Sequence, residues 1–274
     1  MKKFIALLLA AALVLSFAAC GQKKEETPSG GEKSIVDTIK ERGKLIVGTE
    51  AQYAPYEYKN ADADFAGCDI WLAQQIADAL GVELEIVDMA FDGIIPAVQA
   101  GQVDLGIAAF TRTDERAEVI DFSDLYEESK QLLVVAAGNA DVYSTKESLA
   151  GLQVGAQKGT VQSQLIQKAL PDSILFELEK YPALALEVQN GNIAGLVVDE
   201  AVGNALIANS NGALEASNFE FTQEEANFGK AVVCAKGNDA LLDIVNEVVN
   251  RVKADGSYQK AYDDAVEESK QLGL

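Results

Sequence analysis

The residues best suited to chemistry lie in the stretch VDLGIAAFTRTDERAEVIDFSDLY, between Val103 and Tyr126. Its apolar start, Val103–Phe110, predicts a β-strand. The polar residues that follow, TRTDER, predict the start of a helix, because hydroxyl and acidic side chains cap helix N-termini. Ligands of open α/β sheets bind at the carboxyl ends of strands. There Thr111 would offer a hydroxyl, and Arg116 a planar guanidinium for a carboxylate. The spacing equally allows Arg116 to pair with a neighbouring surface acid: Asp114, Glu118 or Asp121.

Composition narrows the kinds of site that this chain can hold. It has 274 residues and a formal net charge of −21, which disfavours nucleic acid as a partner. It has no histidine, so the usual general base and the Ser-His and Cys-His pairs are excluded. The three cysteines, Cys20, Cys68 and Cys234, lack metal-ligand spacing. We therefore expect no metal and no cofactor, and an enzyme here would depend on carboxylates, lysine or tyrosine.

The N-terminus is typical of an exported lipoprotein. Lys2 and Lys3 precede the apolar run Phe4–Leu15, which suits a secretory signal and is too short to span a bilayer. Small residues directly before Cys20 resemble a bacterial lipoprotein cleavage site, which predicts a signal peptide at residues 1–19 and lipidation of Cys20. The alternative is an ordinary cleavage site with an incidental cysteine. Residues 20–34 are polar with Pro and Gly and predict a flexible tether. We therefore expect lipid anchoring at the outer face of the cell membrane.

Hydrophobic periodicity predicts two successive α/β units. In the first, helices and strands alternate with connections short enough for a parallel sheet: Ile35–Arg42 (helix, ended by Gly43), Lys44–Thr49 (strand), Asp69–Leu80 (helix), Val82–Ile86 (strand), Phe91–Ala100 (helix). Between the first strand and the second helix lies an aromatic loop, Glu50–Tyr58.

The second unit repeats this pattern. Its strands are predicted at Gln131–Ala137, Leu152–Ala156, Ile174–Leu178, Ile193–Val198 and Ala231–Ala235. Its helices are predicted at Val161–Leu170, Pro182–Asn190, Glu200–Asn209, Ala240–Lys253 and Ser257–Leu272. Asp199 ends an apolar strand directly before one of these helices, a position that suits a helix N-cap.

These segments together resemble the extracytoplasmic solute-binding proteins of ABC importers, specifically the polar amino-acid family. The resemblance extends from Ile35 to about Tyr262. It rests on the order and spacing of short segments: VGTE (47–50), YAPYE (53–57), GCD (67–69), IPA (95–97), VDL (103–105), TDER (113–116), DFS (121–123), LAG (149–151), GT (159–160), VD (198–199) and KGN (236–238).

The resemblance implies an α/β, two-lobed periplasmic-binding-protein-like fold of type II. Lobe 1 would contain residues 35–126 and 231–274, and lobe 2 residues 127–230. Two crossing segments, near Tyr126–Gln131 and Glu225–Lys230, would act as a hinge that closes the lobes on a ligand. The implied function is to bind an extracellular amino acid as a monomer and to deliver it to the permease subunits of an ABC transporter.

The family pattern also implies how the charged ends of an amino acid are held. The carboxylate would bind Arg116, the Thr111 hydroxyl, and backbone N–H groups near Ala109, Thr160 and Val161. The ammonium would bind Asp199 in the other lobe, unless Asp199 serves as a helix cap. Each end needs such a partner, because burying an unpaired charge costs several kcal/mol.

Four further positions would contact the ligand or its side chain. Tyr53 and Phe91 match aromatic residues that sandwich the ligand in the family, and core packing is the alternative role for both. Glu50 matches an acid that often reaches the ligand's side chain, which favours Lys, Arg, ornithine, Gln or His. Glu50 could instead pair with a cation of the protein or face water. Gln157 matches a further pocket position and suggests a polar side chain.

Other interpretations remain open at this point. Some relatives of the family are dehydratases of cyclic acids, and Glu50 is the obvious acid or base for such a reaction. A ligand-sensing module is a third possibility. Cys68 and Trp71 depart from the family pattern and are expected to be buried packing residues. Cys68 and Cys234 would share lobe 1 and could form a disulfide or stay free thiols.

Overall fold

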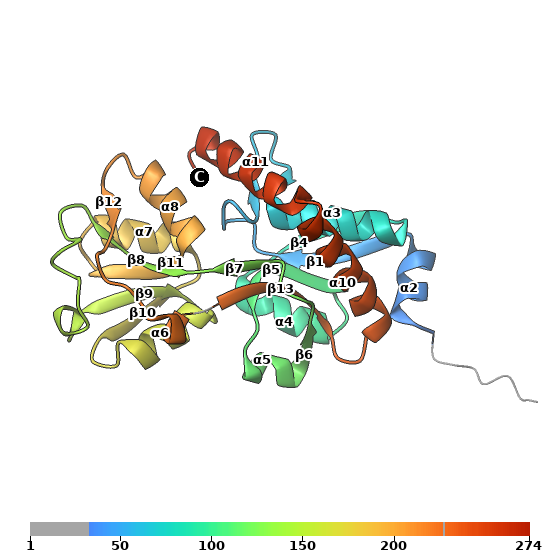
Figure 1. Cartoon of the computed structure of the whole chain (residues 1–274), viewed down its shortest axis with the longest axis horizontal. Helices are drawn as coiled ribbons and strands as arrows, with labels where there is room; N and C mark the ends of the chain where they lie inside the picture. Colours follow the sequence, from blue (N-terminus) through green and yellow to red (C-terminus); the bar gives the residue numbers. More distant parts are fainter. Residues whose placement is uncertain (1–32, 227) are drawn as a thin grey trace, which may run out of the picture. The chain divides into compact units, whose positions relative to one another are not determined.

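The computed structural model describes residues 33–226 and 228–274, of which Ser34–Leu274 form one compact unit. The predicted signal peptide, the lipidation site Cys20 and nearly all of the tether lie outside the described residues. Two separate β-sheets, each with helices on both faces, organise the described chain (Figure 1). We call each sheet with its helices a lobe, and this architecture confirms the expected two-lobed α/β fold.

The first lobe is built on a mixed sheet. Its strands lie in the order β4 (Glu83–Asp88), β1 (Lys44–Thr49), β5 (Leu105–Thr111), β13 (Phe228–Ala235) and β6 (Ile120–Phe122), and β7 (Glu127–Ser129) also pairs with β13. β1 is parallel to β4 and β5, whereas β13 runs antiparallel to its neighbours. Its helices are α2 (Ile35–Arg42), α3 (Cys68–Leu80), α4 (Phe91–Gln99), α5 (Asp114–Val119), α10 (Asp239–Ala254) and α11 (Ser257–Leu272). A short hairpin, β2 (Tyr58–Lys59) and β3 (Phe65–Ala66), precedes α3.

The second lobe has a five-stranded sheet. Its strands lie in the order β10 (Ile174–Leu178), β9 (Gln153–Gln157), β11 (Gly195–Asp199), β8 (Gln131–Ala136) and β12 (Leu214–Ala216). α6 (Val161–Ala169) covers one face, and α7 (Tyr181–Gln189) and α8 (Glu200–Asn209) cover the other (Figure 1). A 3₁₀ turn (Glu147–Leu149) and α9 (Gln223–Ala226) complete this lobe.

The chain crosses between the sheets twice, and the two crossings pair with each other. The first crossing carries β7, and the second enters the first lobe as the start of β13. Their antiparallel register places Glu127 opposite Lys230 and Ser129 opposite Phe228. These crossings lie where the sequence predicts them, while the exact lobe boundaries at 126 and 231 stay a prediction.

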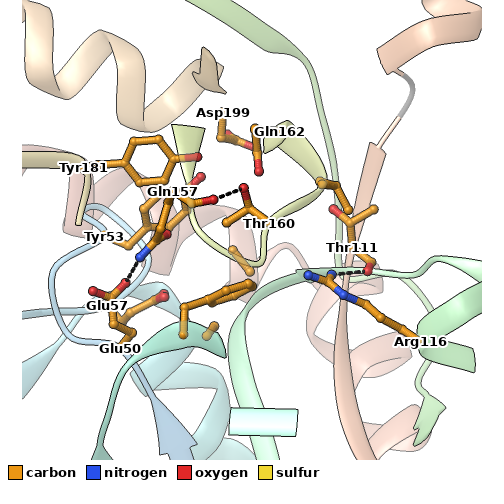
Figure 2. Close-up of a pocket in the computed structure, with 14 residues that line it drawn as sticks. Glu50, Tyr53, Glu57, Thr111, Arg116, Gln157, Thr160, Gln162, Tyr181 and Asp199 are labelled. Atoms are coloured by element: carbon orange, nitrogen blue, oxygen red, sulfur yellow. Dashed lines mark hydrogen bonds between the residues drawn. The ribbon is translucent and has the colours of Figure 1, made fainter. Parts of the chain in front are cut away.

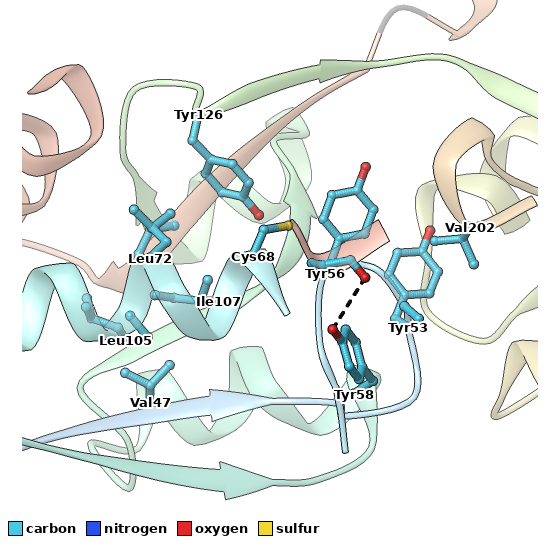
Figure 3. Close-up of a cluster of buried hydrophobic side chains, with 14 of the residues drawn as sticks. Val47, Tyr53, Tyr56, Tyr58, Cys68, Leu72, Leu105, Ile107, Tyr126 and Val202 are labelled. Atoms are coloured by element: carbon cyan, nitrogen blue, oxygen red, sulfur yellow. Dashed lines mark hydrogen bonds between the residues drawn. The ribbon is translucent and has the colours of Figure 1, made fainter. Parts of the chain in front are cut away.

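The main core of the first lobe lies between α3 and the sheet. Leu72 of α3 packs on Val47, Leu105 and Ile107 of the strands, all fully buried or nearly so (Figure 3). The strands approach α4 closely at Gly106, where an added Cβ would lie 2.7 Å from Val233 Cγ2 and 2.9 Å from Ile94 Cγ2. Glycine at this position therefore allows the sheet and α4 to pack.

Local sequence signals set most element boundaries. α2 begins after Ser34, whose Oγ accepts a hydrogen bond from the Asp37 N–H, and ends at Gly43 with φ +75°. The helices at 35–42, 200–209 and 257–272 have the bounds that the sequence predicts. The predicted strand at 103–110 is displaced, so that Thr111 is the last strand residue. The predicted helix at 182–190 begins one residue earlier, at Tyr181.

The structure bears on the expectations for the cysteines Cys68 and Cys234 and for Trp71. Cys68 and Cys234 are both buried free thiols, so the disulfide alternative is wrong. Cys68 packs in the core as expected, and Trp71 packs against this core as a partly buried residue.

Candidate ligand-binding site

A pocket lies where the carboxyl ends of β1, β5, β9 and β11 meet between the lobes (Figure 2). All ten residues predicted from the sequence to bind the ligand line this pocket: Glu50, Tyr53, Phe91, Ala109, Thr111, Arg116, Gln157, Thr160, Val161 and Asp199. Four more complete the lining: Glu57, Ala108, Gln162 and Tyr181. The structure thus brings the nominated residues together, and their roles towards a ligand stay predictions.

Arg116 is held at the end of β5 by carbonyl groups from both lobes. Its Nη1 donates to the Thr111 carbonyl (2.6 Å) and its Nη2 to the Gly159 carbonyl (3.0 Å). The guanidinium also lies near two rings, 5.6 Å from the centroid of Phe91 and 5.5 Å from that of Phe110. Burial lowers the pKa of Arg116 to about 10, which leaves it charged at neutral pH.

The alternative partners for Arg116 are engaged elsewhere or make no ion pair with it. Asp114 lies 3.5 Å from Arg112, and Asp121 pairs with Lys236 at 2.9 Å. Within the described residues no carboxylate forms an ion pair with Arg116, so surface pairing is the wrong interpretation. Its remaining donors are thus available for an anion in the pocket.

A bulge in β5 directs the backbone of Ala108 and Ala109 into the pocket. The register with β13 shifts between Phe110 and Gly106, and Ala109 adopts φ +48°. The Ala109 N–H donates to Asp69 Oδ2 at 2.7 Å. The Ala109 N–H is thus engaged by a buried acid, and the expectation that backbone donors near Ala109 hold a ligand carboxylate stays a prediction.

The opposite wall of the pocket is the N-terminus of α6. Thr160 caps this helix: its Oγ1 accepts from the Ser163 N–H (3.3 Å) and donates to the Gln157 carbonyl (2.6 Å). The Thr160 N–H is directed at the same carbonyl. Val161, the first helical residue, therefore presents its N–H at the positive end of the helix dipole, where an anion is stabilised.

Asp199 caps α8, and its charge is also paired. Its Oδ1 accepts from the Ala201 N–H (3.3 Å), which confirms the cap interpretation. The same oxygen lies 3.4 Å from the Tyr56 hydroxyl oxygen, which donates to Glu127 Oε1 at 2.7 Å. Its Oδ2 lies 3.0 Å from Lys230 Nζ, which also lies 3.1 Å from Glu127 Oε1. Burial alone would lower the pKa of Lys230, but Asp199 and Glu127 raise it above its usual value. Lys230 is therefore a charged ammonium buried at the crossings.

Glu50 occupies the other end of the pocket. Its Oε2 accepts from Gln157 Nε2 at 2.9 Å, which joins the two lobes, and Gln157 also donates to the Glu179 carbonyl (2.6 Å). Its Oε1 is buried without a hydrogen-bond donor among the described residues. Burial raises the pKa of Glu50 to about 7, against the opposing effect of Gln157.

Aromatic rings line the space between these charges. Tyr53 packs against Tyr181 with ring centroids 5.3 Å apart, and Phe91 stacks on Phe110 at 4.8 Å. Tyr53 and Phe91 each contact the core and also line the pocket, and their role of sandwiching a ligand stays a prediction.

Direct contacts hold the lobes together around this pocket. Besides the Arg116 and Gln157 bonds, Lys158 pairs with Asp92 at 2.9 Å. The enclosed volume is only about 20 Å³, space for about one water molecule. An amino acid can therefore enter only when contacts across the cleft open.

Sequence reasoning missed Glu57, Gln162, Tyr181 and Lys230. Glu57 stands in the predicted aromatic loop and Tyr181 directly before a predicted helix, but the direction of both side chains depends on how the chain folds there. The pairing of Lys230 with Glu127 and Asp199 has no local signal, because the partners are far apart in sequence. Residues 33–226 and 228–274 contain no helix long and apolar enough to cross a membrane, and no acidic or cysteine cluster arranged for a metal.

Comparisons with known proteins agree with this architecture. The model of the bacterial extracellular solute-binding proteins, family 3, matches residues 45–267. The ABC transporter glutamine-binding protein GlnH of Bacillus subtilis is 31% identical, over 98% of this chain and 98% of its own length. The arginine-bound structure of AbpA, an amino acid ABC transporter substrate-binding protein of Streptococcus pneumoniae, is 33% identical with a TM-score of 0.81, covering 85% of this chain and 98% of that one. AncCDT-1, an ancestral amino acid-binding protein and precursor of cyclohexadienyl dehydratase, is 34% identical with a TM-score of 0.77, covering 85% and 100%. This chain belongs to family 3 of the bacterial extracellular solute-binding proteins.

Proposed function

We propose that this protein binds an amino acid with a polar or cationic side chain between its lobes and delivers it to the permease of an ABC transporter. The observation that carries the proposal is Arg116: a half-buried guanidinium with spare donors, beside the α6 N-terminus and without an acidic partner among the described residues. A carboxylate supplies the missing charge and accepts several of these donors at once.

The ammonium of the ligand would bind at Asp199. This carboxylate faces the pocket from the second lobe, while Arg116 belongs to the first. A ligand that contacts both residues stabilises the closed arrangement of the lobes, which is a shift in population towards that state. Because Lys230 also contacts Asp199, the ligand's ammonium would share this carboxylate with a second cation.

The ligand's side chain would extend towards Glu50. The buried Oε1 of Glu50 has no donor among the described residues, so a side chain that donates there replaces a missing hydrogen bond. Lys, Arg, ornithine, Gln and His all carry such donors. The arginine bound to AbpA and the glutamine named for GlnH belong to this group.

An enzymatic function has one specific observation in its favour. Glu50 has its pKa raised to about 7 in a buried site, as a general acid requires, and AncCDT-1 is described as the precursor of a dehydratase. Binding without chemistry is the better-supported function, because the named relatives are transporter binding proteins. We further propose that the protein is a monomer anchored through a lipid on Cys20.

A thermal-shift screen tests the proposal. The full chain carrying Cys20→Ala is unfolded, dialysed and refolded to remove any co-purified ligand, and is then heated with each standard amino acid, ornithine or citrulline. A ligand at about 100 times its Kd adds about 2.7 kcal/mol of stability, an increase in Tm of about 5–10 °C. If no amino acid raises the Tm, incubation with cyclic hydroxy acids and analysis of the products tests the enzymatic alternative.

A further inference from the structure

Lys230 of the second crossing is fixed between two carboxylates. β7 and the start of β13 pair as the two crossings, and Lys230 stands opposite Glu127 in their register (Figure 1). Its side chain is 1% exposed, and Nζ lies 3.1 Å from Glu127 Oε1 and 3.0 Å from Asp199 Oδ2. The third contact of Nζ is with the Tyr56 ring, whose centroid is 4.4 Å away. These three contacts match the three donors of an ammonium, so Lys230 has no donor left for a ligand.

Glu127 is held in place by hydroxyl groups of the first lobe. Its Oε1 accepts from the Tyr56 hydroxyl at 2.7 Å, and its Oε2 accepts from the Tyr258 hydroxyl at 2.9 Å. Neither Glu127 nor Lys230 lines the ligand pocket, whereas Asp199 does. Any effect of Glu127 on a ligand therefore acts through the charge that Asp199 presents.

Asp199 keeps acceptor positions for a further cation. A carboxylate has about four lone-pair sites, of which Lys230 contacts one at Oδ2 and the Ala201 N–H another at Oδ1. Glu127 and Asp199 carry two formal negative charges against the single positive charge of Lys230. One negative charge is thus uncompensated within this group, and Asp199 is the member that faces the pocket.

We propose that Glu127 is a positioning residue for the ligand's ammonium: by sharing Lys230 with Asp199, it leaves one negative charge at the pocket for that ammonium. Without the charge of Glu127, Lys230 would pair with Asp199 alone, and the ligand's ammonium would meet a carboxylate that is already neutralised. The inference deepens the proposed function and rests on it for the ligand. The sharing of Lys230 is a property of the chain without ligand.

The two carboxylates are close enough for this charge to affect binding. Because Glu127 Oε1 and Asp199 Oδ2 lie 3.1 Å and 3.0 Å from the same nitrogen, they are at most about 6 Å apart. At about this separation and an effective dielectric constant of about 20, one unit charge changes the binding of a cation by about a hundredfold. The Glu127 side chain is 20% exposed and lines a groove over the crossings, so solvent screens part of this effect. We therefore expect a change in affinity of about tenfold.

Calorimetric titration of the full chain carrying Cys20→Ala tests the role of Glu127 towards the ligand. The probes are L-arginine and 5-guanidinopentanoate, which is arginine without its α-ammonium, and L-glutamine with 4-carbamoylbutanoate as a second pair. We expect E127Q to weaken the amino acid by about tenfold and to leave its analogue unchanged. K230M should instead tighten the amino acid, because Asp199 then has no resident cation. The control E128Q removes an exposed carboxylate of the same strand and should change neither affinity.

Opposite effects of E127Q and K230M distinguish a charge effect from damage to the site. If E127Q weakens the amino acid and its analogue equally, Glu127 acts only on the shape of the site and the proposal is wrong. If E127Q and K230M both weaken the amino acid, Lys230 does not compete with the ligand's ammonium, which also overturns the proposal.

Thermal unfolding without ligand tests the sharing of Lys230 by itself. In the wild type Glu127 still pairs with Lys230 when Asp199 loses its charge, so D199N should lower the Tm only slightly. In E127Q the same substitution leaves Lys230 buried without a carboxylate, so D199N should lower the Tm by about 5 °C more. Equal losses of Tm in the two backgrounds would refute the sharing. If no amino acid binds the wild type, the proposed function fails while this result still stands.

Discussion

Replacing Lys230 by methionine should destabilise the fold more than any change to a surface ion pair. The Lys230 side chain is 1% exposed and lies 3.0 Å from Asp199 Oδ2 and 3.1 Å from Glu127 Oε1. Methionine retains much of the volume but removes the cation that these two carboxylates share. Two carboxylates then remain without their shared counter-charge in a region that water reaches poorly.

The size of the loss follows from the burial of the partners. Breaking a buried ion pair by removing one partner costs about 3–5 kcal/mol. The Asp199 side chain is 5% exposed, but that of Glu127 is 20% exposed and keeps hydrogen bonds from the Tyr56 and Tyr258 hydroxyls. We therefore expect the lower end of this range, about 3 kcal/mol, or a fall in Tm of about 6–12 °C.

Urea and thermal unfolding followed by circular dichroism measure this loss. The matched control is K236M, because Lys236 forms an equally short pair with Asp121 (2.9 Å) but is 49% exposed. The free energy of unfolding of K236M should be less than about 1 kcal/mol below that of the wild type. K230M/D199N should be more stable than K230M alone, because one of the two uncompensated charges is gone. If K230M is as stable as K236M, the buried ion network does not stabilise the fold and the reasoning is wrong.

Three other predictions concern the pocket and the core. R116A should abolish amino-acid binding in calorimetry without changing the fold. The control R112A, which removes a guanidinium that is 57% exposed, should bind normally. Normal binding by R116A would exclude Arg116 as the partner of the ligand's carboxylate. Because Glu50 must be ionised to bind a cation and its pKa is about 7, affinity for a cationic ligand should fall as pH decreases below about 7, by up to about tenfold per unit, while E50Q should show no such dependence. G106A should lower the free energy of unfolding, measured with urea, by about 1–3 kcal/mol, because its Cβ would overlap Val233 and Ile94. G93A, with open space at its Cβ, should leave this free energy unchanged or raise it. Equal stability of the two variants would contradict this packing argument.

The sequence allowed the long elements to be predicted because their signals are local. Ser34 and Gly43 mark the ends of α2, and the spacing of Leu72, Ile76 and Leu80 marks the buried face of α3. The short strands β6, β7 and β12 were missed, because three residues are too few to show a period. They exist only because a longer strand lies beside them.

The candidate site was predictable to the extent that it depends on residue type at strand ends. Arg116 follows an apolar strand and is charged, so its position suggested a site. The ligand roles of Glu50 and Asp199 followed from the resemblance to the family. Ala109 at φ +48° could not be foreseen, since alanine rarely adopts this conformation and only the Asp69 acceptor explains it here. Lys230 was placed in a crossing segment, but its burial depends on tertiary partners.

The buried thiols of Cys68 and Cys234 can report local unfolding of the first lobe. Burial raises the pKa of Cys234 to about 12 and that of Cys68 well above its usual range, so both stay protonated and unreactive while the first lobe is folded. Cys68 begins α3, whereas Cys234 lies in β13. Pulse labelling with an alkylating reagent would thus compare the exposure of a helix start with that of a strand in one molecule. Equal labelling rates would indicate that the lobe unfolds as a single cooperative unit, and unequal rates would identify the part that opens first.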